Sequence, residues 1–131
     1  MNGNNFELKP LSPYSHMFKG RNNMENRIDY YYLNKLPSND VQFYQQLKDS
    51  VFLLAEKRYD FNLYSIYIYK ETDELNEKFN KQKLWLDGHN KDLIAYIRFN
   101  NGENDIFYII QNEIVIFDNV KNEKVYFEFE Q

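Results

Sequence analysis

The stretch that decides the fold is DIFYIIQNEIVIFDNVKNEKVYFEFE, residues 105–130. It contains three runs rich in β-branched and aromatic residues, separated by short polar gaps: 105–111, 113–118 and 124–130. Such residues favour strands, and gaps of this length favour antiparallel hairpins. A fourth run from Leu93 to Phe99 alternates regularly and precedes the turn at 100–102, which ends in Gly102. The sequence therefore predicts a four-strand antiparallel meander.

The alternation within these runs also separates core from surface. The runs 105–111 and 113–118 are apolar on both faces, which is typical of central strands covered on two sides. The side chains that we expect in the core are Phe107, Ile109, Val115, Phe117, Val125, Phe127 and Phe129. If Phe127 is fully buried, its truncation to Ala would cost about 3–5 kcal/mol. The opposite face of the last run holds Lys124, Tyr126, Glu128 and Glu130.

Residues upstream of the meander predict two helices and two strands. A capping box of Asn39 and Gln42 opens a helix from about 40 to 58, whose apolar stripe repeats every three or four residues. A strand follows at 61–70, with Tyr64, Ile66 and Ile68 on one face.

A second helix is expected from 73 to about 83, with Thr72 or Asp73 as its cap and Leu75 and Phe79 on its buried side. The residues 87–90, which include Gly88, should end it.

The prediction for the whole chain is a single α+β domain, 1–131. Residues 1–37 hold all three prolines and form an irregular N-terminal segment with one strand at 27–33. Residues 38–131 form a helix-strand-helix unit followed by the meander. The architecture is a mostly antiparallel sheet of four to six strands with two helices on one face.

Motifs that would carry chemistry are absent from the sequence. No Cys is present, the two histidines are His16 and His89, and no two of the four glycines share a local loop. These counts exclude disulfides, thiolate metal sites and the familiar glycine-rich nucleotide loops. We expect no metal, no cofactor and no catalytic residue. The chain has neither a secretion signal nor an apolar run of the roughly 20 residues of a membrane span, so we expect a cytoplasmic protein with no membrane partner.

Charge is distributed unevenly along the chain. The net charge is −4, but residues 1–70 sum to +2 and residues 71–131 to −6. Nucleic acid is a poor partner for an acidic half, because its binding relies on Lys and Arg. A basic protein fits better. The residues expected to bind it are exposed Tyr, Asp and Glu of the last three runs and their turns: Tyr108, Glu113, Asp118, Glu123, Tyr126, Glu128 and Glu130.

The leading hypothesis is a non-catalytic, immunity-type protein that neutralises a basic bacterial toxin, with nucleases as one toxin class. One alternative is a small enzyme that uses His89 with Asp87 and Asp92. Another is an accessory domain that forms homodimers through an exposed sheet edge. A third reading assigns no docking role to the aromatic face, because residues 1–37 would cover it. The sequence leaves the oligomeric state open.

Overall fold

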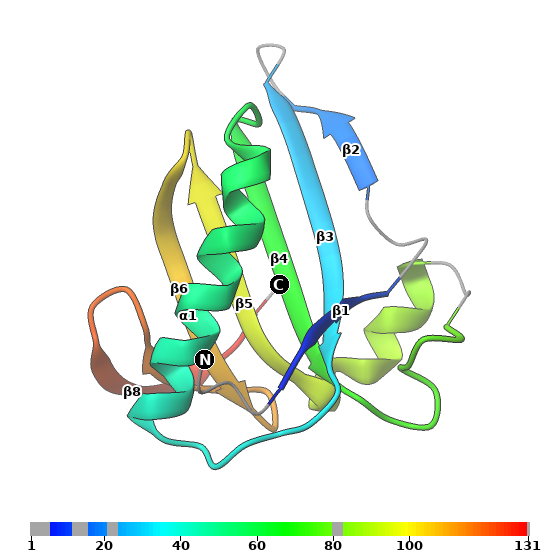
Figure 1. The fold of residues 1–131 in the computed structure, drawn as a ribbon, viewed down its shortest axis with the longest axis vertical. Coiled ribbons are helices and arrows are strands. Elements are labelled where there is room, and N and C mark those ends of the chain that lie inside the picture. Colours follow the sequence, from blue (N-terminus) through cyan, green and yellow to red (C-terminus); the bar gives the residue numbers. More distant parts are fainter. Residues whose placement is uncertain (1–5, 12–15, 21–23, 80–82, 131) are drawn as a thin grey trace.

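The computed structural model describes residues 6–11, 16–20, 24–79 and 83–130. Within them, one α-helix lies across one face of a twisted sheet (Figure 1). The strands are β1 Leu8–Pro10, β2 His16–Lys19, β3 Glu25–Leu33, β4 Leu63–Lys70, β5 Leu93–Asn100, β6 Glu103–Gln111, β7 Ile114–Asp118 and β8 Glu123–Glu128. The helices are α1 Val41–Ala55 and the 3-10 helices η2 Glu56–Arg58 and η3 Lys83–Asp92.

The sheet contains both antiparallel and parallel pairs of strands. Seven strands follow the order β1-β3-β4-β5-β6-β7-β8, and β2 pairs with β3 beside β1. β5 to β8 are consecutive antiparallel hairpins, as the alternation of residues 93–130 predicts. β3 and β4 are parallel, and α1 crosses over between them. One edge of the sheet is therefore β8, while the other is made by the short strands β1 and β2.

Helix α1 begins one residue later than its predicted capping box requires. Asp40, not Asn39, is the N-cap, and its side chain accepts a hydrogen bond from the backbone N–H of Phe43 at 3.0 Å. An extended backbone at Asp40 makes this bond possible. The apolar stripe is confirmed, since Leu47 and Val51 are fully buried against the sheet.

The core has two parts, one on each face of the sheet. On the α1 face, Tyr64, Ile66 and Ile68 of β4 pack together as predicted. On the opposite face, the segment 72–79 and η3 contribute Leu75, Phe79 and Leu86, which lie against tyrosines of β3 and β4. The strands β5, β6 and β7 thus contribute buried side chains to both parts of the core.

The second predicted helix is wrong. Residues 73–79 form bends and turns, because Thr72 Oγ1 accepts the backbone N–H groups of Glu74 and Leu75 at 3.2 and 2.9 Å. Short polar side chains that bond nearby backbone groups compete with a helix in this way. The expected turn at 87–90 instead lies within η3, which kinks at His89. Among the described residues, helix α1 therefore lies on one face of the sheet and η3 on the other.

The predicted strand count is also too low, because residues 1–37 were expected to supply one strand. In the structure they supply three strands, β1, β2 and β3, which brings the sheet to eight.

Val115 and Phe117 are buried as predicted, but they do not share a face. They belong to different core clusters, since the β7 pairing shifts register between them and turns their side chains to opposite faces. The prediction that Phe127 is a core residue is wrong. Phe127 is 41% exposed, because β8 is an edge strand with cover on one side only. Val125 and Phe129 are half-buried, whereas Phe107 and Ile109 are buried as predicted.

Candidate protein-binding surface on the β8 edge

The most exposed aromatic side chain among the described residues lies on β8. Tyr126 is 81% exposed, and its neighbour Phe127 is 41% exposed. The carboxylates of Glu123, Glu128 and Glu130 are exposed beside them. We call Tyr126, Phe127 and these three glutamates the β8 surface. The two exposed rings occupy adjacent positions of one edge strand.

The two rings of the β8 surface project from opposite faces of the sheet. Phe127 pairs with Val115, which belongs to the cluster opposite α1. Lys124 pairs with Phe117, which belongs to the cluster beneath α1. Because side chains alternate along a strand, Tyr126 shares the face of Lys124 rather than that of Phe127. The β8 surface therefore wraps around the edge of the sheet.

Tyr108 supports this surface instead of extending it. Its ring is half-buried against the core cluster opposite α1 and meets Phe127 edge to face, with centroids 5.3 Å apart and planes at 83°. Edge-to-face pairs of this kind are favourable and fix the orientation of both rings. Tyr108 therefore holds Phe127 in place.

Glu113 and Asp118, the predicted binding residues at the turns, have local structural roles. The carbonyl of Glu113, which adopts a φ of 67°, accepts the backbone N–H of Phe129 at 2.9 Å. Asp118 Oδ1 accepts the N–H groups of Val120 and Lys121, both at 3.0 Å. The side chain of Glu113 remains exposed, whereas the carboxylate of Asp118 is engaged in its turn.

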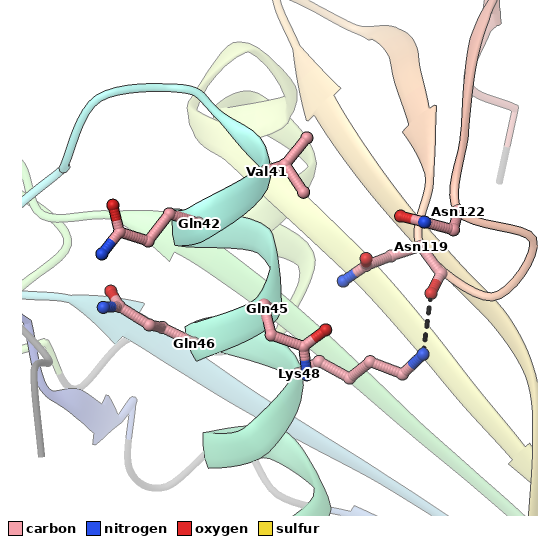
Figure 2. Close-up of a pocket in the computed structure, with 7 residues that line it drawn as sticks. All are labelled: Val41, Gln42, Gln45, Gln46, Lys48, Asn119 and Asn122. Carbon is pink, nitrogen blue, oxygen red and sulfur yellow. Dashed lines mark hydrogen bonds between the residues drawn. The ribbon is translucent and has the colours of Figure 1, made fainter.

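A recess of about 540 Å³, lined mostly by polar side chains, lies between α1 and the β7–β8 turn (Figure 2). Its wall is Asn119, which is buried and donates from Nδ2 to the carbonyl of Tyr44 at 3.0 Å. Lys48 Nζ reaches across from α1 and donates to the carbonyl of Asn119 at 3.0 Å. The side chains of Gln42 and Gln46 point away from the turn (Figure 2). No local sequence pattern indicates the role of Asn119, since that role depends on a contact with Tyr44 of α1, 75 positions away in the chain.

The alternative catalytic group, His89 with Asp92, does come together. His89 Nδ1 lies 3.1 Å from Asp92 Oδ2, and Nε2 lies 3.3 Å from Glu74 Oε2. Both ring nitrogens therefore face carboxylates. Asp92 also lies 3.6 Å from Lys70 Nζ. These contacts tie the segment 72–79 to η3 and β4.

The side chains of Asp87 and His16, named in the sequence analysis, lie outside the described part of the structure. Among the described residues, no three His, Asp or Glu side chains are grouped so that they could hold a metal ion. Within the same residues, no helix has the length and apolar character needed to cross a membrane.

Comparison with known proteins gives no family assignment. No family model, no curated protein and no solved structure matches this chain.

Proposed function

We propose that this protein is a non-catalytic inhibitor of the immunity type, which binds a basic bacterial toxin through the β8 surface. The observation that supports the proposal is the exposure of Tyr126 and Phe127 on an edge strand, with three exposed glutamates around them. Aromatic side chains at the centre of an interface commonly supply most of its binding energy. The glutamates would select a partner that carries Lys and Arg.

The negative charge that would attract a basic toxin extends over the C-terminal region from Glu113 to Glu130 and is not confined to β8. Between Glu113 and Glu130 the chain has five carboxylates and two lysines. Proteins that bind nucleic acids commonly neutralise the backbone phosphates with Lys and Arg, so nucleases often present a basic surface. Nucleases are therefore the first class of toxin to test.

The geometry of β8 also indicates how the partner would approach. Because the two rings lie on opposite faces, one flat partner surface cannot cover both from a single side. The partner has to grip the edge of the sheet, reaching Tyr126 on the α1 face and Phe127 on the other. The polar recess beside Asn119 lies on the α1 face and would receive the same partner.

A second copy of the chain is the competing occupant of this edge. In antiparallel self-pairing centred on Tyr126, Lys124 of one copy would stand opposite Glu128 of the other, which is a favourable cross-strand pair. Self-pairing would require only a sufficient concentration of this protein, whereas toxin binding requires a second protein. Sedimentation of the purified protein over a range of concentrations separates the two occupants.

The direct test uses co-expression with the product of the adjacent gene. We expect growth rescue and a complex that survives purification, and we expect Tyr126→Ala to weaken that complex at least tenfold, as for an interface hot spot. The matched control is Tyr59→Ala, since Tyr59 is 51% exposed but lies after η2, far from β8 in the fold. A neighbouring product that is neither toxic nor bound, or equal weakening by both variants, would count against the proposal.

A further inference from the structure

A second cavity, separate from the β8 surface, lies where the segment joining β3 to α1 crosses the ends of β4, β5 and β6. Its volume is about 560 Å³. We call it the linker pocket. Cavities that bind small molecules commonly measure about 300–1,000 Å³, so a small ligand would fit.

The floor of the linker pocket is apolar. Phe43 of α1, Ile94 of β5 and Ile109 of β6 line it, and each of these side chains, which belong to the core beneath α1, is at least nine-tenths buried. Leu36 stands at the rim and is 57% exposed. An apolar floor that continues to an exposed leucine offers a binding surface for a hydrocarbon body.

The rim of the linker pocket is cationic, although the protein as a whole is acidic. Lys70 and Lys91 both line it, and Asp92 is the one carboxylate of the lining. Asp92 is already engaged, because its two oxygens lie 3.6 Å from Lys70 Nζ and 3.1 Å from His89 Nδ1. Lys91 is exposed and has no ion-pair partner among the described residues. One positive charge at the mouth is therefore uncompensated.

Amide groups complete the rim. Asn39 Nδ2 lies 3.4 Å from Gln111 Oε1, a long contact that links the segment before α1 to the end of β6. Asn112 is exposed at the same side. These amides can donate to an anionic head group without the repulsion that a second free carboxylate would cause.

We propose that the linker pocket binds a small amphipathic anion, with a hydrocarbon body on the apolar floor and a single carboxylate head beside Lys91. The uncompensated charge of Lys91 favours an anionic head group, and the apolar floor favours a hydrocarbon body. This inference does not depend on toxin binding, since the linker pocket and the β8 surface share no residue.

The test compares three probes of equal chain length and different charge: octanoate, octan-1-ol and octylammonium. Backbone amide shifts in NMR spectra of the full chain give both the affinity and the location. We expect saturable shifts with octanoate at Leu36, Ile94 and Ile109, at millimolar concentration, and at least tenfold weaker binding of octylammonium.

Charge reversal at the rim provides the decisive variant. Lys91→Glu should weaken octanoate about tenfold and strengthen octylammonium, because the charge at the rim changes from attracting a carboxylate to repelling it. Lys57→Glu is the matched control, since Lys57 is equally exposed but belongs to η2 at the far end of α1. Binding of all three probes with equal affinity would mean an apolar patch without anion recognition, and would overturn the proposal.

Three further outcomes would also overturn it. These are the absence of saturable shifts with octanoate up to about 10 mM, shifts located away from the linker pocket, and shifts at Leu36 that depend on protein concentration without any probe. The last would show that a second copy occupies the pocket. A thermal melt of Lys91→Glu that matches the control variant shows that the fold is intact, so each of these results bears on binding.

Discussion

Asp29 of β3 is a buried carboxylate that joins the sheet to the end of α1, and its removal should destabilise the fold strongly. It is 2% exposed. Its Oδ2 accepts the hydroxyl of Tyr64 at 2.6 Å, and its Oδ1 accepts Nε of Arg27 at 2.9 Å. Arg58 of η2 lies 3.6 Å from Oδ2. Burial, together with the hydrogen bond to Asp29, raises the pKa of Tyr64 far above its usual value and keeps its hydroxyl a donor.

The perturbation is Asp29→Asn, which keeps the shape of the side chain and removes its charge. Arg27, whose side chain is 16% exposed, then loses its counter-ion, whereas Arg58 is one-third exposed and is partly screened by water. Breaking a buried ion pair costs about 3–5 kcal/mol, and we expect about 3 here because water reaches Arg58. Tyr64→Phe removes one hydrogen bond to a charged group and should cost about 2 kcal/mol.

Urea denaturation at neutral pH measures both losses of unfolding free energy, provided that this free energy depends on urea concentration as steeply in the variants as in the wild type. The double variant should cost about 1 kcal/mol less than the two single costs combined, since Asp29 and Tyr64 share one bond. Asp105→Asn is the control, because the pair of Arg98 and Asp105 has an equally short contact of 2.6 Å but is about one-third exposed on both sides. We expect that control to cost less than about 1 kcal/mol. If Asp29→Asn costs no more than the control, burial does not govern the strength of this network.

Three other predictions concern the core, alkaline pH and the helix cap. Phe107→Ala should lower the free energy of unfolding by about 3–5 kcal/mol and Phe127→Ala by less than about 2 kcal/mol, because the first ring is fully buried and the second is 41% exposed; urea denaturation of both variants tests this difference. Burial raises the pKa of Tyr67 from 10.0 to about 12, so the neutral hydroxyl stabilises the fold at lower pH and this contribution is lost as pH rises from 10 to about 12. Tyr67→Phe should reduce the loss of unfolding free energy at alkaline pH by up to about 2 kcal/mol, whereas Tyr59→Phe, at an exposed ring, should not. Chemical denaturation at several alkaline pH values measures this loss. The expectation is contradicted if both variants lose stability with pH as steeply as the wild type. Asp40→Ala should cost about 1 kcal/mol through loss of the α1 cap, and a calorimetric melt unchanged from wild type would mean that the cap is dispensable.

The local alternation of the C-terminal residues was enough to predict the meander. Side chains two residues apart share a face, and short polar gaps between Leu93 and Glu130 leave little choice except hairpins. The parallel pairing of β3 with β4 could not be predicted in the same way. It depends on contacts between residues that are more than thirty positions apart, and no local pattern specifies the partner of a strand.

The incorrect predictions concern features that the periodicity of apolar residues in the sequence does not specify. At 73–79 the spacing of Leu75 and Phe79 fits a helix, and both side chains are buried as predicted, but hydrogen bonds from Thr72 and Asn76 fix turns instead. On β8 the alternation assigns Phe127 to the correct face without revealing that little packs over an edge strand there. The exposure of Tyr126 was predictable from alternation, while the wall formed by Asn119 was not, because it requires the position of α1.

The parallel connection through α1 has a consequence for the order in which the chain folds. Hairpins β5 to β8 close short loops and can pair as soon as their residues are available. β3 and β4 can pair only after the crossover through α1 has closed a much longer loop, and such non-local pairings slow folding. β4 takes part in both kinds of pairing, since it pairs with β3 on one side and with β5 on the other. We therefore expect the rate-limiting step to be the docking of β3 and α1 onto a preformed meander. Variants at Leu47 should then slow folding, whereas variants on β8 should mainly speed unfolding.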